Sequence, residues 1–271
     1  MRVVMTGAAG GVGTMIRPYL RKIASELVLS DRSEITDAVD NEVSVAADLT
    51  DLDAMEHLMR GADGLVHLGG QSVEADWNTV LDANIVGLYN TYEAARRQGC
   101  HRIVFATTNH VVGYYRRQQT IDHTVMPRPD SRYGVSKAFG EALGRMYADK
   151  HGLRVFNIRI GNVGEKPLDV RRLAIWVSPR DLTQLIEIGL SHPNLHYEVV
   201  YGCSKNARSW WDNSNAYRLG YNPRDEAEAY AEIAHAASNA NPDDPITAQF
   251  QGGTFCADEF DGDTGRVDQT R

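Results

Sequence analysis

Short apolar segments alternate with longer helix-like segments along the first 160 residues. The short segments are rich in β-branched residues and are predicted as strands: Arg2–Thr6, Glu26–Ser30, Val43–Ala46, Gly64–His67, Arg102–Thr107 and Arg154–Arg159. The longer segments are predicted as helices: Gly11–Ile23, Leu52–Met59, Trp77–Gln98 and Tyr133–His151. Alternation of this kind is typical of βαβ units, so the sequence predicts an α/β fold with a doubly wound parallel sheet.

The pattern becomes less regular after residue 160. A loop rich in Gly, Pro and Arg is followed by a predicted helix, a strand and two further helices: Pro179–Leu190, Glu198–Tyr201, Ser214–Leu219 and Glu226–Ser238. These elements are too few for an independent core. We therefore expect a main domain over residues 1–160 and a small subdomain over residues 161–271, with a soft boundary within one structural unit. Near the acidic C-terminus, only Gln249–Cys256 is apolar enough to dock.

Composition and charge narrow the range of functions. The 271 residues carry 28 Lys and Arg against 36 Asp and Glu, which gives a formal net charge of -8. A negative chain repels phosphate backbones and anionic lipids, so we expect neither nucleic acid nor a membrane as a partner. No stretch approaches the roughly 20 apolar residues of a membrane span, and the first apolar run is too short for an export signal.

The three cysteines are far apart in the chain and odd in number: Cys100, Cys203 and Cys256. They provide neither a disulfide framework nor a CxxC pair for a metal ion. We therefore expect a cytoplasmic protein with no metal site.

Three glycines follow the first predicted strand at the point where a helix begins: Gly7, Gly10 and Gly13. Glycines there allow a positive φ and let backbone N–H groups approach a pyrophosphate, whose charge the helix N-terminus favours. Three glycines also fit a simple turn, but their place between a strand and a helix favours a dinucleotide site.

Asp31 follows the second predicted strand, near the spacing of roughly 20 residues at which an acid binds the ribose hydroxyls of a dinucleotide. Its carboxylate would repel a 2′-phosphate, so NAD is favoured over NADP. A solvated acid at the end of a strand is the alternative, and Arg32 next to it could weaken the preference.

Tyr133 and Lys137 stand four residues apart at the start of a predicted helix, so both project from one face. An ammonium near a phenol stabilises the phenolate and lowers the phenol pKa from its usual value of about 10. We therefore predict that Tyr133 is a base near neutral pH. The same spacing is also common on helix surfaces without any function.

The strand predicted over Arg102–Thr107 runs directly into Thr108, Asn109 and His110. Side chains at the carboxyl end of a parallel strand face the ligand crevice, so the Thr108 hydroxyl could bond a reacting alcohol oxygen. These polar side chains could instead cap the strand end through backbone hydrogen bonds.

Taken together, these motifs resemble the extended short-chain dehydrogenase/reductases. The matching residues also include Asp48 after the third strand, Gly70 after the fourth and Asn84 in a long helix. The resemblance covers most of residues 1–160 and implies a Rossmann-type sheet that binds NAD. The implied cofactor contacts are Gly7, Gly10, Val12, Gly13, Asp31, Asp48, Leu49, Leu68, Gly69, Gly70 and Lys137.

Within that superfamily, the chain is most similar to the uronate dehydrogenases. The similar stretches are His67–Glu74, Thr107–His110, Tyr133–Lys137, Arg159–Gly161, Trp210–Ser214 and Phe250–Phe255. Because they extend into the C-terminal region, the similarity spans nearly the whole chain.

The resemblance implies a role for each matching residue. Tyr133 would be the catalytic base, with Lys137 and Thr108 completing the catalytic group. The implied sugar contacts are Ser72, Thr108, Asn109, His110, Asn162 and Arg171, and the last of these would hold the uronate carboxylate. Two positions depart from the family: Thr108 and Asn162 stand where serine is usual. Thr108 keeps the hydroxyl, whereas Asn162 alters a sugar contact.

The implied reaction is the NAD-dependent oxidation of D-galacturonate or D-glucuronate at C1 to the aldaric acid lactone. The partner would be a small sugar acid, and the reaction requires no metal. By the same analogy, the helices over Trp77–Gln98 and Tyr133–His151 are expected to form the interface of a homo-oligomer.

Three alternatives stay open at this point. A sugar-phosphate dehydrogenase, acting for example on glucose 6-phosphate, would use Lys166, Arg171 and Arg172 as cations. A nucleotide-sugar epimerase would need a larger C-terminal domain than this chain allows. A non-catalytic dinucleotide sensor would have no use for the pair of Tyr133 and Lys137.

Overall fold

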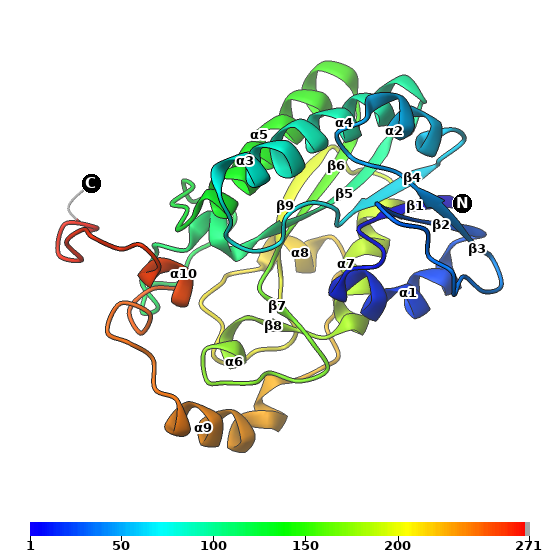
Figure 1. Ribbon diagram of the computed structural model, residues 1–271. Coiled ribbons are helices and arrows are strands. Elements are labelled where there is room, and N and C mark those ends of the chain that lie inside the picture. The colour runs from blue at the N-terminus through cyan, green and yellow to red at the C-terminus, as the bar shows by residue number, and fades with distance from the viewer. Residues whose placement is uncertain (269–271) are drawn as a thin grey trace.

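Seven parallel strands form the central sheet of the computed structural model, which describes residues 1–268 (Figure 1). Their order across the sheet is β3-β2-β1-β4-β5-β6-β9. The interior of β1 is fully buried, as expected for a strand that is covered on both faces. The strands are β1 (Arg2–Thr6), β2 (Glu26–Asp31), β3 (Glu42–Ala46), β4 (Gly64–His67), β5 (Arg102–Thr108), β6 (Arg154–Ile160) and β9 (Tyr197–Gly202).

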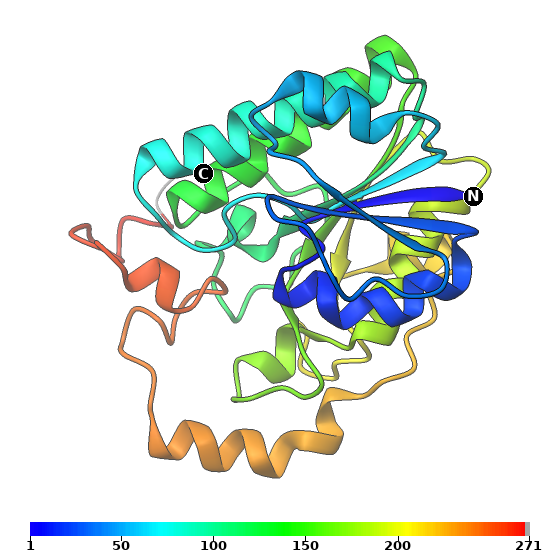
Figure 2. The ribbon, with the colours of Figure 1, turned by 45° about the vertical axis from the view of Figure 1, so that its right-hand side comes forward.

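Helices cover both faces of this sheet (Figure 1 and Figure 2). Val3 and Met5 of β1 belong to the core beneath α1 (Gly11–Ile23) and α7 (Pro179–Ser191). Val4 points to the opposite face, because successive side chains of a strand alternate. That face is covered by α2 (Leu52–Met59), α4 (Gly87–Arg97) and α5 (Arg132–His151). The predicted α/β fold with a doubly wound parallel sheet is confirmed.

The segment predicted as one helix over Trp77–Gln98 is divided by a π-helical turn. It consists of α3 (Trp77–Val80), the π-helical turn η1 (Leu81–Val86) and α4. Asn84 lies in the turn and is buried, and its side chain bonds backbone groups of Gln71 and the Ser136 hydroxyl. The wider turn therefore places a polar side chain between the loop after β4 and helix α5.

The chain beyond residue 160 contributes α7 and β9 to the sheet layers and then builds a smaller layer around Ile121, Tyr201 and Trp211. The Tyr201 and Trp211 rings stack with their centres 4.7 Å apart. The remaining elements are η2 (Asn109–Val112), β7 (Asn162–Val163), α6 (Arg172–Ile175), β8 (Trp176–Val177), α8 (Ser214–Arg218), η3 (Ala227–Tyr230), α9 (Ala231–Ala240) and α10 (Thr254–Ala257). The division near residue 160 stays a prediction.

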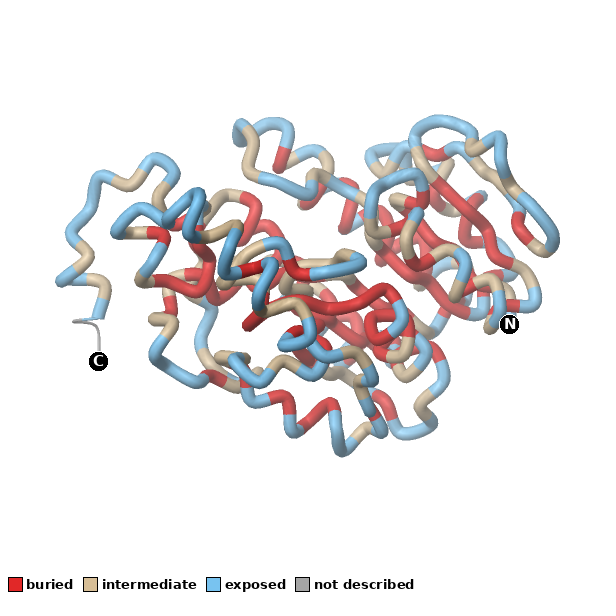
Figure 3. Tube along the Cα trace, turned by 90° about the horizontal axis from the view of Figure 1, so that it is seen from below, coloured by how far each residue is buried: buried red, intermediate tan, exposed pale blue. Residues whose placement is uncertain are grey.

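Burial follows this layering (Figure 3). The three cysteines are buried and unpaired. Within residues 1–268, no helix is long and apolar enough to cross a membrane, and no group of three or more His, Cys, Asp or Glu side chains is arranged to hold a metal ion.

Candidate active site

A cleft of about 830 Å³ opens where β1 lies between β2 and β4. The sheet order reverses there, which is where ligands bind in open α/β sheets. The structure brings ten of the predicted cofactor residues together in this cleft. These residues are Gly7, Gly10, Val12, Gly13, Asp31, Asp48, Leu49, Leu68, Gly69 and Gly70.

The glycine loop leaves no room for side chains. A Cβ at Gly13 would lie 2.6 Å from the Gly7 carbonyl oxygen, and one at Gly7 would lie 2.7 Å from the Gly69 nitrogen. Gly7 also has a φ of +69°, which favours glycine. The loop therefore packs tightly between β1, α1 and the loop after β4, with its backbone open to the cleft.

Asp31 ends β2 and connects that strand with the glycine loop. Its Oδ2 accepts a hydrogen bond from Ala9 N at 3.1 Å, and its Oδ1 accepts from Arg32 N at 2.9 Å. The carboxylate is partly exposed in the cleft. Asp48 lies nearby, and hydrogen bonds from the Thr50 backbone and hydroxyl lower its pKa. The cleft therefore presents negative charge where a ribose would lie.

Tyr133 and Lys137 lie on the first turns of α5, close to the end of β5. Ser131 caps the helix by accepting a hydrogen bond from Gly134 N at 3.0 Å, and Glu74 accepts one from Tyr133 N at 2.9 Å. The Lys137 Nζ donates to the Ala106 carbonyl at 2.8 Å and lies 5.8 Å from the centre of the Tyr133 ring. The structure thus brings the predicted pair together at the carboxyl edge of the sheet.

Burial controls the titration of both groups. It raises the pKa of Tyr133 to about 12, while a hydrogen bond with Thr108 acts in the opposite direction. Burial also lowers the pKa of Lys137 to about 8. The expectation that Lys137 lowers the pKa of Tyr133 below its usual value is therefore wrong for this structure. Desolvation of the phenol outweighs the attraction of an ammonium that is itself desolvated and bonded to a carbonyl.

The predicted sugar contacts Asn109 and Arg171 lie next to this group. The Arg171 guanidinium donates to the Gln251 carbonyl from Nε at 3.1 Å and from Nη2 at 2.8 Å. With the Asn109 amide nitrogen donating to the Ile160 carbonyl, the amide oxygen accepts from Arg171 Nη2 at 3.3 Å. Burial, followed by repulsion from Arg117, lowers the pKa of Arg171 to about 10. Within residues 1–268, no carboxylate forms an ion pair with this guanidinium.

The other predicted sugar contacts come from three different segments. Ser72 is exposed and lines the cofactor cleft. Asn162 begins β7 and is half-buried. His110 follows Asn109 in η2, and its ring lies with its centre 6.0 Å from that of Tyr133.

Three neighbours of the site were absent from the sequence prediction: Glu74, Asp130 and Phe255. Phe255 stacks on His110 with ring centres 3.9 Å apart, and Asp130 accepts a hydrogen bond from His110 Nδ1 at 2.8 Å. Glu74 and Phe255 lie in stretches that resemble the uronate dehydrogenases, but no site role was predicted for them, because neither similarity nor apolar composition reveals which surface a segment covers.

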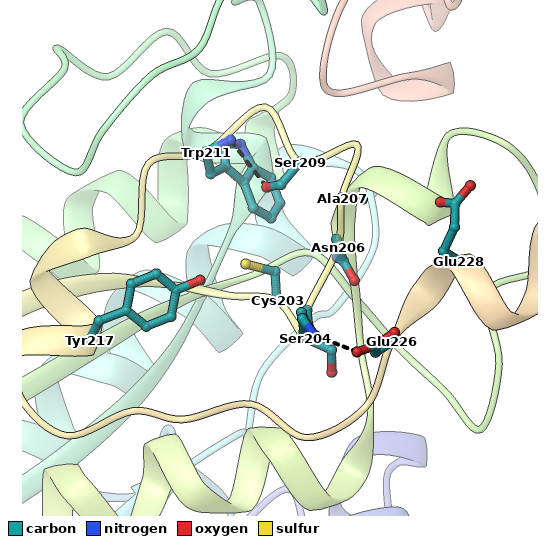
Figure 4. A pocket seen from close by; sticks show the side chains of 10 residues that line it. Cys203, Ser204, Asn206, Ala207, Ser209, Trp211, Tyr217, Glu226 and Glu228 are labelled. Atoms are coloured by element: carbon teal, nitrogen blue, oxygen red, sulfur yellow. Dashed lines mark hydrogen bonds and ion pairs between the residues drawn. The ribbon is translucent and has the colours of Figure 1, made fainter.

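A second cavity, of about 340 Å³, lies in the smaller layer (Figure 4). Its acidic side chains are engaged by cations, Glu226 by Lys205 and Glu228 by Arg208. Burial raises the pKa of its Cys203 thiol to about 12, which makes the thiol unreactive. None of the predicted site residues lines this cavity.

Comparison with known proteins agrees with the geometry of the cleft. Residues 3–210 match the model of the NAD dependent epimerase/dehydratase family. The chain belongs to this family. It is 43% identical over 263 residues to uronate dehydrogenase from Pseudomonas syringae pv. tomato, covering 97% of this chain and 95% of the relative. It is 46% identical to uronate dehydrogenase from Agrobacterium fabrum, covering 94% of this chain and 96% of the relative.

Solved structures of this family give the same result. A crystal structure of uronate dehydrogenase from Agrobacterium tumefaciens, a tyrosine-to-alanine mutant complexed with NAD, has a TM-score of 0.89 and 44% sequence identity. It covers 94% of this chain, which covers 97% of the crystallised chain. The predicted resemblance to uronate dehydrogenases is confirmed, and the protein is an NAD-dependent oxidoreductase.

Proposed function

We propose that the protein oxidises D-galacturonate or D-glucuronate at C1, producing the aldaric acid lactone and NADH. The observation that carries this proposal is the position of Arg171. Its guanidinium has no carboxylate partner within residues 1–268 and bonds Asn109, which directly follows Thr108. Arg171 thus contacts the residue next to Thr108, whose hydroxyl is proposed to act in catalysis. A cation at this place suits a sugar that carries a carboxylate. The similarity to uronate dehydrogenases supports the same substrate class.

The cleft fits NAD on structural grounds. The glycine loop excludes side chains from the start of α1, where a pyrophosphate would bind backbone N–H groups. Asp31 would bind the ribose hydroxyls, and Asp48, Leu49 and Leu68 would form the walls around the base and the ribose. When bound, NAD supplies a hydride acceptor and a positive charge near the site.

Tyr133 would take the proton of the C1 hydroxyl as the C1 hydride leaves, so that a carbonyl forms at C1. Thr108 would orient this hydroxyl, because its own hydroxyl hydrogen-bonds Tyr133. Lys137 would bind the nicotinamide ribose and stabilise the phenolate. Since burial alone raises the pKa of Tyr133 to about 12, phenolate formation depends on positive charge at the site.

Arg171 would bind the uronate carboxylate through Nη1, because Nε and Nη2 already donate to Gln251 and Asn109. Asn109, His110, Ser72 and Asn162 would bind the sugar hydroxyls. The structure disfavours a sugar phosphate as substrate, because Arg172 is paired with Asp169 and Lys166 is exposed. Arg171 alone is a weak match to a doubly charged phosphate.

A substrate panel tests this proposal. Initial rates of NADH formation are measured with galacturonate, glucuronate, a neutral aldose and glucose 6-phosphate, each with NAD and with NADP. We expect turnover of the two uronates with NAD. Turnover of glucose 6-phosphate without turnover of either uronate would refute the proposal.

The chain is also proposed to act in the cytoplasm as a homo-oligomer. Three unpaired buried cysteines support a reducing compartment. Exposed apolar side chains on α3, η1, α4 and α5 support a subunit interface there: Trp77, Val86, Tyr89 and Val135.

A further inference from the structure

A buried carboxylate behind the sugar site has no role in the mechanism proposed above. Asp130 precedes α5, and its side chain has an exposed fraction of 0%. Three donors surround it. His110 Nδ1 lies 2.8 Å from Oδ2, the Ser131 hydroxyl lies 2.8 Å from Oδ1, and Cys256 Sγ lies 3.8 Å from Oδ2. Asp130 can accept from each, so the geometry assigns the proton between Asp130 and His110 to Nδ1.

Two glycines enclose this carboxylate. A Cβ at Gly113 or at Gly252 would lie 1.9 Å from Asp130 Oδ2. Gly113 follows η2, whereas Gly252 comes from the C-terminal region, and Gly252 N donates to the Gly113 carbonyl at 2.9 Å. The two segments therefore close on Asp130 and fix its orientation.

The His110 ring is held from two directions. Asp130 accepts from Nδ1, and Phe255 stacks on the ring with centres 3.9 Å apart. When Nδ1 carries the proton, Nε2 of the neutral ring has a free lone pair. Within residues 1–268, Nε2 makes no hydrogen bond, and the ring meets Tyr133 edge-on with centres 6.0 Å apart.

We propose that Asp130 is a positioning residue that fixes the Nδ1-protonated form of His110, so that Nε2 accepts a hydrogen bond from a substrate hydroxyl. The inference rests on the proposed function, because it requires the sugar to bind on the side of the site that His110 faces. The other titratable or charged groups facing Asp130 are Tyr114, Tyr133, Arg171 and Cys256. None of them bonds Nδ1, so Asp130 alone determines this tautomer.

Two substitutions test the role of Asp130. Asp130→Leu keeps the branched shape but cannot accept a hydrogen bond, and Asp130→Asn keeps the shape and one acceptor. We expect the KM for galacturonate to rise about tenfold or more in Asp130→Leu and less in Asp130→Asn. Without the Nδ1-protonated form, His110 Nε2 no longer accepts from the substrate hydroxyl, which leaves a buried polar group unpaired. The dissociation constant for NAD should change by less than about twofold, since Asp130 lies outside the cofactor cleft.

Asp149→Asn is the matched control, because Asp149 lies at the far end of α5 and pairs with Arg145 and His196 on the surface. Its KM should equal that of the native chain. An unchanged KM in a folded Asp130→Leu chain that binds NAD would overturn the proposal.

Nitrogen NMR of His110 provides a readout that does not depend on turnover. We expect a proton on Nδ1 in the native chain and on Nε2 in Asp130→Leu. A proton on Nε2 in the native chain would overturn the assignment, even if no variant folds. Failure of the proposed function is distinguishable, because it would appear as a lack of uronate oxidation by the native chain, whatever the tautomer.

Discussion

Tyr133 lies where a phenol can serve as a base only with help from nearby charge. Replacing it with phenylalanine removes the proton acceptor and leaves the ring in place. We expect kcat to fall by about 10²- to 10⁴-fold, the usual contribution of a positioned acid or base. NAD affinity should stay nearly constant. Tyr89→Phe, on the exposed face of α4, is the control. Initial-rate kinetics that show less than a tenfold loss for Tyr133→Phe would exclude it as the base.

Arg171 is the residue on which the choice of substrate depends. Arg171→Met keeps most of the side-chain volume but removes the guanidinium, so kcat/KM for galacturonate should fall at least tenfold, about 1.4 kcal/mol. Arg180→Met, at an exposed site paired with Asp225, is the control. A smaller loss in steady-state kinetics would show that Arg171 does not bind the carboxylate.

The depressed pKa of Lys137 makes stability depend on pH. Its pKa is about 8 in the folded chain, against an ordinary value near 10.4. Between these values the unfolded chain binds a proton that the native chain lacks, so the free energy of unfolding rises with pH, by at most about 1.4 kcal/mol per unit. Below pH 8 both states are protonated and this contribution is constant.

Denaturant unfolding at pH 8, 9 and 10 checks this dependence. Lys137→Met should lose the increase with pH that the native chain shows over this range. Tyr133→Phe should keep it, because the raised pKa of Tyr133 acts only above its ordinary value of about 10. If the free energy of unfolding rises equally with pH in the native and Lys137→Met chains, the lowered pKa of the buried Lys137 is contradicted.

At the scale of elements, the π-helical turn η1 connects the cofactor cleft with α5. Asn84 forms three hydrogen bonds from this turn, two to the Gln71 backbone and one to Ser136. At about 1 kcal/mol each, Asn84→Ala should lower the free energy of unfolding by about 3 kcal/mol. It should also weaken NAD binding, because Gln71 lines the cleft. Asn78→Ala, at an exposed position of α3, is the control.

Calorimetry measures the stability of the Asn84→Ala and Asn78→Ala chains, and titration with NAD measures their affinity for the cofactor. An Asn84→Ala chain with native stability and native NAD affinity would show that the turn does not position the loop after β4.

The sequence predicted most elements because most strands contain a short apolar run that ends at turn residues. It missed the π-helical turn, since a helix-like alternation of polar and apolar residues does not distinguish an α-helical from a π-helical turn. It also missed that Asp130 faces His110, because that contact depends on a loop whose path only the folded chain determines. The predicted lowering of the Tyr133 pKa was wrong, because the spacing of two residues along a helix contains no information about their burial.

At the scale of the whole molecule, the exposed apolar side chains on α3, η1, α4 and α5 predict self-association. We expect a mass in solution that is a multiple of 30.0 kDa. Tyr89→Glu should lower this mass, because a charge at a subunit interface is costly to bury. Ile233→Glu is the control, since Ile233 on α9 is similarly exposed, 52% against 46% for Tyr89. Light scattering that finds a monomer for the native chain would contradict the prediction.

The similarity to uronate dehydrogenases covers nearly the entire chain. The C-terminal segment belongs to this similarity because it holds residues of the sugar site. Gln251 provides the carbonyl that holds Arg171, and Phe255 stacks on His110. The nucleotide cleft lies within the first 83 residues, but the sugar side needs segments separated by 80 residues or more. Sequence motifs therefore identify the cofactor more readily than the substrate.

Oxidation of galacturonate that carries deuterium at C1 shows which carbon loses the hydride. The products with NAD are analysed by mass spectrometry and NMR. We expect one deuterium in the nicotinamide ring of each NADH formed, together with a sugar lactone that has lost its C1 deuterium. Deuterium that remains at C1 of the sugar while NADH accumulates would show that the hydride comes from another carbon, and would contradict oxidation at C1.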